Sequence, residues 1–526
     1  MRKLTGTGLL ACSTALMLAT GAFAQDRPLR LDEAAIGEID PAKGSDYADT
    51  VLAVNLYEPL VYPNQGAPGV QPWLASDWTI DGLDYTFTIR DGATFASGNP
   101  VTAEDVVYSF ERLMALGQGP SSLFEGRVAS VEAVDDSTVT FTLTDQFAPF
   151  LASLVQLSIV DSTLVQENAE EEYAPNWLSA NSAGSGAYVV TEHDPQVETV
   201  MVPNENYNGQ AMDAAAPDEV TYRYSLEAST VRALMARGEH DISSLWLPPE
   251  VLKAMADEGT VHLEAEPGGT GEYIMLNTQR PPLDDVHCRR ALTLAYDYAT
   301  TLQLLSVTDD MAQGVAMNGP MPQGFFGSNP DRPPLAQDME AAQAELAECQ
   351  YSVDDYPLDL AWIAEVPARE RLALLMQATF TQLGFDVKVT RTPWALITQQ
   401  VTEPETAPHA IEIAVSARTP DTDSLAFNMF SSSVPHTWMS ATYLADDEVD
   451  RLLNEGRTET DPEARAEIYK AMSERLRDLA PAIWAYEFTG VYGVRNGVEV
   501  PNLQEEGKLY PISGFSMLFK DIQVND

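Results

Sequence analysis

The pattern of apolar and polar positions between residues 357 and 430 predicts alternating strands and helices. Apolar side chains alternate over 358–363, as expected for a mostly buried strand. The next segment carries apolar residues at three- and four-residue spacing and stops at Gly384, which is typical of a helix. Further strands are predicted over 387–389 and 411–415. Strand–helix–strand units favour a parallel sheet with right-handed crossovers, so an α/β fold is predicted.

A second unit of the same kind lies earlier in the chain. It has a predicted strand over 220–224, a helix over 228–237 and a strand over 241–243. Ligands of open α/β sheets bind beyond the carboxyl ends of the strands. Trp246 and Trp394 follow strands in the two units, so we expect them to face each other as ligand contacts. Core packing is the alternative for each ring.

The N-terminal segment has the pattern of an export signal. Arg2 and Lys3 precede an apolar run over 9–19, and Ala22-Phe23-Ala24 forms an A-x-A cleavage site. We therefore expect residues 1–24 to be removed after Ala24 and the remainder to be exported to the periplasm.

Two cysteines remain after that cleavage. Cys288 precedes a predicted helix over 289–305, and Cys349 follows one over 339–347. An oxidising compartment permits a disulfide between them, and two buried thiols are the alternative.

Length and charge narrow the class of protein. A chain of 526 residues exceeds what one hydrophobic core usually organises, so two or three lobes are expected. The net charge of −49 disfavours nucleic acid and anionic membranes as partners. An acidic, solvated surface is the simplest interpretation, and cation binding is the alternative.

Another region carries a more specific pattern. Residues 84–90 form a half-buried strand, and a capping box of Thr102 and Asp105 opens a helix. The whole stretch 74–113, LASDWTIDGLDYTFTIRDGATFASGNPVTAEDVVYSFERL, resembles the signature of peptide- and nickel-type solute-binding proteins of ABC importers. SAGSGAYVV (182–190), NENYNG (204–209) and LDDVHCRRALTLAYDY (283–298) are similar to later landmarks of that family.

The resemblance implies a periplasmic-binding-protein-like fold, in which two α/β lobes are joined by a hinge and the first lobe carries an inserted domain. Lobe I would comprise residues 25–50, 188–268 and 488–526, domain II residues 51–187, and lobe III residues 269–487. The implied function is capture of an oligopeptide or similar solute between the lobes and delivery to an ABC permease. We expect a monomer without cofactors.

The resemblance also indicates site residues. Tyr47 lies in a loop that lines the family's cleft, and Trp394 is similar in position to a tryptophan of its peptide pocket. Peptide binders carry an aspartate, which pairs with the peptide's ammonium group, three residues before an acidic position. Asp421 occupies that acidic position, and counting back gives Arg418. A guanidinium suits an anionic or hydroxyl-rich group; a register slip would instead make Asp421 or Asp423 the anchor.

Catalytic and metal-binding patterns are weak. The six histidines form no H-E-x-x-H pair, and neither a nucleophile elbow nor a P-loop occurs. His436 lies near Met429 and Met439, but one histidine is a poor basis for a metal site. We therefore expect a binding protein without enzymatic activity. An oligosaccharide or anionic, opine-like ligand is the alternative within this class, and a periplasmic hydrolase is the alternative from another.

Overall fold

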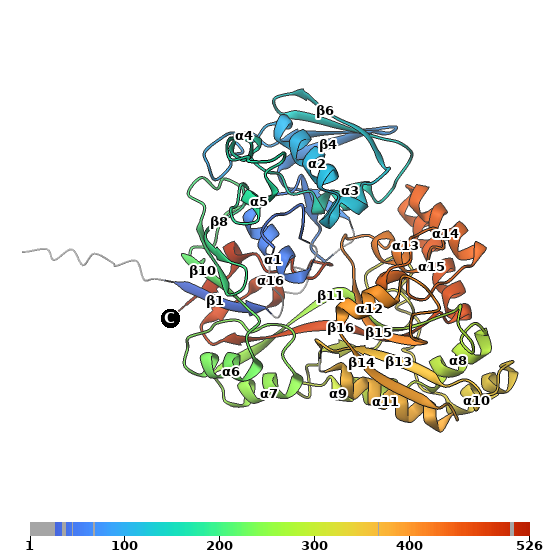
Figure 1. Cartoon of the computed structure of the whole chain (residues 1–526). Coiled ribbons are helices and arrows are strands. Elements are labelled where there is room, and N and C mark those ends of the chain that lie inside the picture. Colours follow the sequence, from blue (N-terminus) through green and yellow to red (C-terminus); the bar gives the residue numbers. More distant parts are fainter. Residues whose placement is uncertain are drawn as a thin grey trace, which may run out of the picture.

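The computed structural model describes residues 27–33, 38–44, 46–66, 69–366, 368–504 and 510–525. Figure 1 shows three parts: lobes I and III side by side, with domain II above them. The predicted signal peptide, its cleavage site and Pro367 lie outside the described residues. Within the described residues, no helix combines the length and apolar character needed to cross a bilayer.

Lobe I contains a four-stranded sheet in the order β1 (Pro28–Glu33), β10 (Glu219–Tyr224), β9 (Glu198–Pro203), β8 (Tyr188–Asp194). Strands β1 and β10 are parallel, and the other neighbours are antiparallel. Alternating side chains such as Leu29 and Leu31 are buried, as period-two patterning requires. The helices of this lobe are α1 (Tyr47–Leu56), α6 (Ala228–Ala236), α7 (Pro249–Asp257) and α16 (Pro501–Gln504).

Lobe III contains a six-stranded mixed sheet. Its order is β12 (Gly314–Val315), β16 (Ala482–Arg495), β11 (Val261–Leu276), β15 (Ala410–Ser416), β13 (Leu358–Ile363), β14 (Val387–Thr392). Strand β13 runs parallel to both β14 and β15, which confirms the predicted parallel unit. Packed on one face are α8 (Val286–Ala295), α9 (Tyr298–Leu304) and α11 (Arg369–Gln382). The other face carries α12 (Trp394–Gln400), α13 (Asp423–Phe430), α14 (Asp447–Thr458) and α15 (Pro462–Leu479).

The long antiparallel pair β11 and β16 connects the two lobes (Figure 1). Ile242 bridges Leu31 of β1 and Val494 of β16, which joins this pair to the sheet of lobe I. The ladder is interrupted at Gly268 and Gly269, because Pro267 pairs with Thr489 and Thr270 with Phe488. Gly269 has φ +61°, a left-handed conformation that favours glycine. This interruption lies where the chain passes from one lobe to the other.

Domain II is built on an antiparallel sheet in the order β4 (Ala75–Asp81), β5 (Asp84–Ile89), β7 (Thr138–Leu143), β6 (Val128–Asp135). Helix α2 (Ala103–Leu116) packs on this sheet, and its predicted capping box of Thr102 and Asp105 is present. Shorter elements complete the domain: β2 (Val61–Pro63), β3 (Val70–Pro72), α3 (Phe150–Ser153), α4 (Ser162–Glu167) and α5 (Pro175–Leu178).

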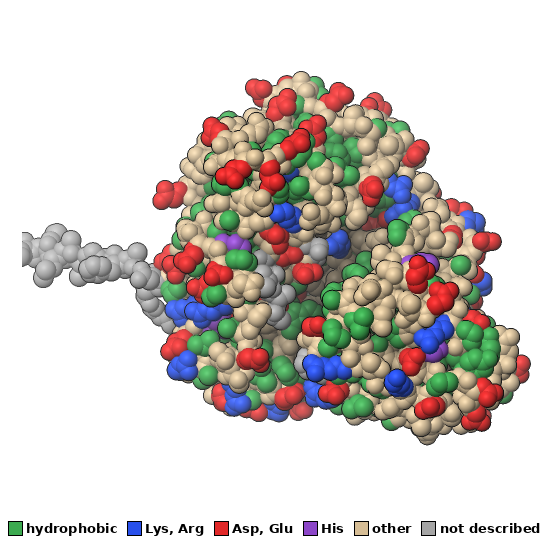
Figure 2. All heavy atoms as spheres, viewed as in Figure 1, with side chains coloured by type: hydrophobic (Ala, Val, Ile, Leu, Met, Phe, Trp, Pro, Cys, Tyr) green, Lys and Arg blue, Asp and Glu red, His purple; other side chains and the backbone are tan. Residues whose placement is uncertain are grey.

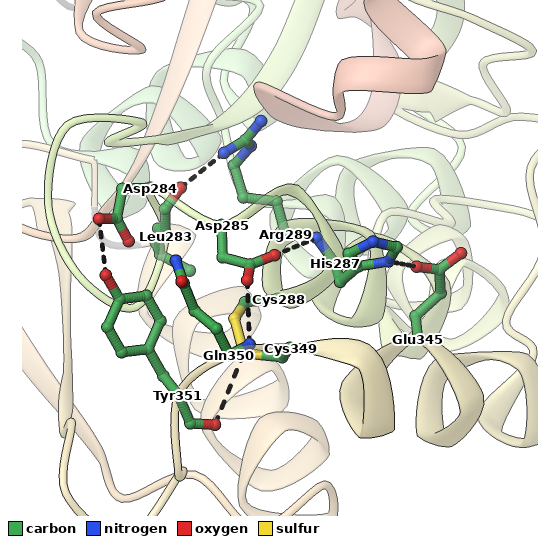
Figure 3. The surroundings of a disulfide bond; sticks show 10 residues. All are labelled: Leu283, Asp284, Asp285, His287, Cys288, Arg289, Glu345, Cys349, Gln350 and Tyr351. Atoms are coloured by element: carbon green, nitrogen blue, oxygen red, sulfur yellow. Dashed lines mark hydrogen bonds and ion pairs between the residues drawn. A yellow bond between two sulfur atoms is a disulfide. The ribbon is translucent and has the colours of Figure 1, made fainter.

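The predicted disulfide between Cys288 and Cys349 is present. It joins α8 to the residue after α10 (Met339–Glu348), as Figure 3 shows. Around it, Gln350 N donates to Asp285 Oδ2 at 2.9 Å, and His287 Nδ1 lies 2.7 Å from Glu345 Oε2. The bond therefore reinforces a junction that polar contacts also hold.

Two local predictions were wrong. The helix expected over 289–305 is divided into α8 and α9, because Asp297 caps a new helix with its side chain. The strand expected over 241–243 is a single bridge at Ile242, although the backbone of this segment still bonds to both neighbours, with Asp241 N donating to the carbonyl of Arg30 and Ser243 N to that of Gly493. The exact domain boundaries stay a prediction.

Candidate functional site

A pocket opens between lobes I and III and encloses about 600 Å³, including its open mouth. Its walls come from loop 245–249, the end of α9, the start of α11, and strands β11 and β16. Most of the lining is apolar, with Leu247 and Leu305 among the aliphatic side chains. Gln313 Nε2 donates to the carbonyls of Leu245 and Leu247, at 3.2 and 2.8 Å, and so fixes the lobe I loop against lobe III.

Trp246 lines this pocket as a partly exposed ring. Its side chain is stacked on Phe488 of β16, with ring centroids 4.8 Å apart and planes inclined by 19°. Trp394 begins α12 and packs edge-on against Trp438 at 5.4 Å, outside the lining of this pocket. The two predicted tryptophans therefore do not share one pocket wall, although each follows the carboxyl end of its unit.

A buried charge cluster forms part of the pocket wall, since Glu272 and Arg369 belong to the lining. Arg369 Nε is 2.9 Å from Glu272 Oε1, and Arg369 Nη2 donates to Glu272 Oε2 at 3.0 Å. Glu412, on the neighbouring strand β15, is also buried. Burial, and secondly the charge of Glu272, raise the pKa of Glu412 well above its usual value. Burial raises the pKa of Glu272 as well, but the charge of Arg369 opposes that shift, so Arg369 is the ion-pair partner of Glu272.

The loop after β15 carries the three predicted polar contacts. The carboxylate of Asp421 pairs in a bidentate manner with Arg465, at 2.5 and 2.8 Å. Asp423 pairs likewise with Arg457, at 2.7 and 3.0 Å. These acids therefore anchor the loop to α14 and α15, which favours a structural role for both carboxylates.

Arg418 has surroundings of a different kind. It is half-buried, and its charged neighbours are Asp46 and Asp49 at the start of α1 in lobe I. Burial lowers the pKa of Arg418, an effect that the two acids oppose. Its carbonyl accepts a hydrogen bond from Gln156 Nε2 of domain II at 2.5 Å. Lobe I, domain II and lobe III therefore meet around this residue, and Figure 2 shows a hollow where the three parts meet.

Tyr47 is held by its hydroxyl group. Tyr47 Oη lies 2.5 Å from Tyr492 Oη and donates to Glu266 Oε2 at 3.2 Å. Gly514 N donates to the other oxygen of Glu266 at 3.0 Å. Burial raises the pKa of Glu266, and burial with that neighbouring carboxyl raises the pKa of Tyr47. The hydroxyl is thus engaged within the protein and the ring is half-buried, while contact of Tyr47 with a solute stays a prediction.

Trp246, which was predicted as a ligand contact, lines this pocket, whereas sequence reasoning did not single out the residues around it. Phe488 belongs to a long apolar strand, and Arg369 begins a predicted helix, so neither stands out by local pattern. Among the described residues, Asp285, Cys288 and Cys349 are the one group with close metal-ligand atoms. Because the two sulfurs are bonded to each other (Figure 3), this group is a disulfide site.

Comparison with known families identifies the protein class. Residues 69–436 match the family described as bacterial extracellular solute-binding proteins, family 5. The chain belongs to this family. The predicted family and fold class are confirmed, and the chain is a solute-binding component of an ABC importer.

Individual relatives cover almost the whole chain. The probable D,D-dipeptide-binding periplasmic protein DdpA of Escherichia coli K12 is 30% identical over 493 residues, spanning 90% of this chain and 92% of the relative. The ABC transporter substrate-binding protein CtaP of Listeria monocytogenes is structurally similar, with a TM-score of 0.82 and 19% sequence identity. The match covers 95% of this chain and 100% of CtaP. The periplasmic binding protein DppA of Helicobacter pylori, solved with the peptide STSA, has a TM-score of 0.78 and 22% sequence identity, and the match covers 95% of this chain and 98% of DppA.

Proposed function

We propose that this family 5 protein captures an oligopeptide or a similar small solute in the periplasm and delivers it to a membrane permease. The observation that carries the proposal is the pocket whose walls come from both lobes and from the strands that connect them. The names of DdpA and DppA support a peptide as the ligand class. Export would follow cleavage after Ala24, and the protein would act as a monomer without catalysis.

Closure of the lobes would retain the solute. Arg371 of α11 reaches Glu250 of α7 at 3.4 Å, across the mouth of the pocket. On the opposite side, Ala148 N of domain II donates to the carbonyl of Arg457 at 2.8 Å. A solute that contacts both lobes favours the closed arrangement, because it gains more contacts there than in an open one.

Arg418 would select the polar end of the solute. Its guanidinium is suited to a carboxylate or hydroxyl groups, and the nearby Asp46 and Asp49 add negative charge to its surroundings. This mixture of charges favours a solute whose polar end carries both signs or several hydroxyls. An anionic, opine-like compound is therefore the second candidate ligand.

The test is mass spectrometry of small molecules released when the purified protein is denatured, followed by calorimetric titration with the compound found. A peptide bound at one-to-one stoichiometry and recovered intact supports the proposal. A sugar or acidic metabolite would replace the peptide assignment, and conversion of the added compound would favour the hydrolase alternative.

A further inference from the structure

The charges of the interlobe pocket are already neutralised within the protein. Arg369 and Glu272 form a bidentate pair within the lining, and their side chains are 7% and 2% exposed. Arg371 and Glu250 pair at the rim, where both are exposed. A charged group of a solute entering the pocket would lose its water without gaining a free counterion. Burying a charge in that way is unfavourable.

The remaining lining offers apolar and aromatic contact. Aliphatic side chains from loop 245–249, α9 and α11 surround the stacked rings of Trp246 and Phe488. Trp246 is 39% exposed, so a large part of an aromatic side chain is open to the pocket that it lines. Contact with a solute would remove this surface from water, and an aromatic group would gain further by packing against the rings.

We propose that this pocket binds an uncharged apolar or aromatic side group of the solute. The assignment rests on the proposed function and adds the chemical class of one part of the ligand. The transported solute is thus amphipathic: its side group occupies the pocket beside Trp246, and its polar end lies toward Arg418.

The experiment uses the full mature protein and a panel of peptides based on tri-alanine, with one residue at a time replaced by phenylalanine or aspartate. Dissociation constants are measured by calorimetry for the wild type, Trp246→Ala, Trp246→Phe and Leu374→Ala. Leu374 is the matched control, because it is an apolar residue on α11 that is 50% exposed and lies outside the pocket lining. Indole binding is followed in parallel by saturation-transfer NMR.

A phenylalanine-bearing peptide should bind more tightly than tri-alanine and its aspartate counterpart. Trp246→Ala should weaken that peptide roughly three- to tenfold and leave tri-alanine nearly unchanged. Trp246→Phe should retain most of the affinity, and Leu374→Ala all of it. Indole should bind the wild type and lose binding in Trp246→Ala.

The two proposals fail in different ways. If peptides bind but phenylalanine gives no advantage, or if Trp246→Ala weakens every peptide equally, the pocket assignment is overturned and peptide binding stands. If no peptide binds while indole still depends on Trp246, the peptide function fails and the pocket assignment stands. If neither peptides nor indole bind, both are refuted.

Discussion

Removal of the disulfide should lower the stability of lobe III without altering ligand binding. Cys288 and Cys349 are 61 residues apart in the chain. Restricting a loop of that length in the unfolded chain is worth about 4 kcal/mol in the chain-entropy model. In the folded protein, the contacts of Asp285 with Gln350 and of His287 with Glu345 still hold α8 against α10. The effect is therefore expected mainly in the unfolded state.

The double variant Cys288→Ala/Cys349→Ala tests this reasoning. Hydrogen exchange of the slowest amides of α8 and α10 gives the free energy of unfolding for this part of the molecule. A decrease of about 4 kcal/mol is expected, with the ligand dissociation constant unchanged. Wild-type protein treated with a reducing agent is the control and should behave like the variant. A decrease below about 1 kcal/mol would refute the assigned contribution.

Three further outcomes are expected. The raised pKa of Glu412 means that the folded state binds an additional proton, so the stability of the wild type should fall as pH rises above about 4.3. In thermal unfolding, Glu412→Gln should reduce this dependence of stability on pH. The control Glu467→Gln changes an exposed side chain and should not reduce it. Arg369→Met leaves Glu272 buried without its partner and should lower the free energy of unfolding in urea by about 3–5 kcal/mol. The double variant Arg369→Met/Glu272→Leu should recover most of that loss. A double variant as unstable as the single one would contradict the assigned cost of the unpaired carboxylate. Arg418→Ala should weaken calorimetric binding of the co-purified ligand roughly tenfold, and an unchanged affinity would exclude Arg418 from ligand contact.

Local periodicity predicted the elements in which the spacing of apolar residues matches the buried side of the strand or helix. The unit β13–α11–β14 was predictable because apolar residues recur at strand spacing in β13 and β14 and because α11 buries one side against the sheet. Periodicity failed where an element is divided or very short. The side chain of Asp297 caps a new helix inside the single helix that was expected. The backbone at 241–243 bonds to β1 and β16, but it forms only one bridge, at Ile242.

The site was predicted only in part, because its residues are distant in the chain. Trp246 was identifiable as an aromatic residue after a predicted α/β unit. Its stacking partner Phe488 is brought to it by the pairing of β11 with β16, which no local pattern specifies. The arginine partners of Asp421 and Asp423 come from α14 and α15, and a sequence does not show that these acids are already paired.

The interruption of the β11–β16 ladder gives the protein an internal optical reporter. Phe488 pairs with Thr270 directly beside the unpaired Gly268 and Gly269, and its ring is stacked on Trp246. A rotation of the lobes about this interruption would move the lobe III side of the pocket relative to this ring pair, and the changed surroundings of Trp246 would change its emission. Stopped-flow fluorescence should therefore follow the rate of lobe closure without an attached dye. Trp246→Phe identifies the contribution of this single ring to the signal.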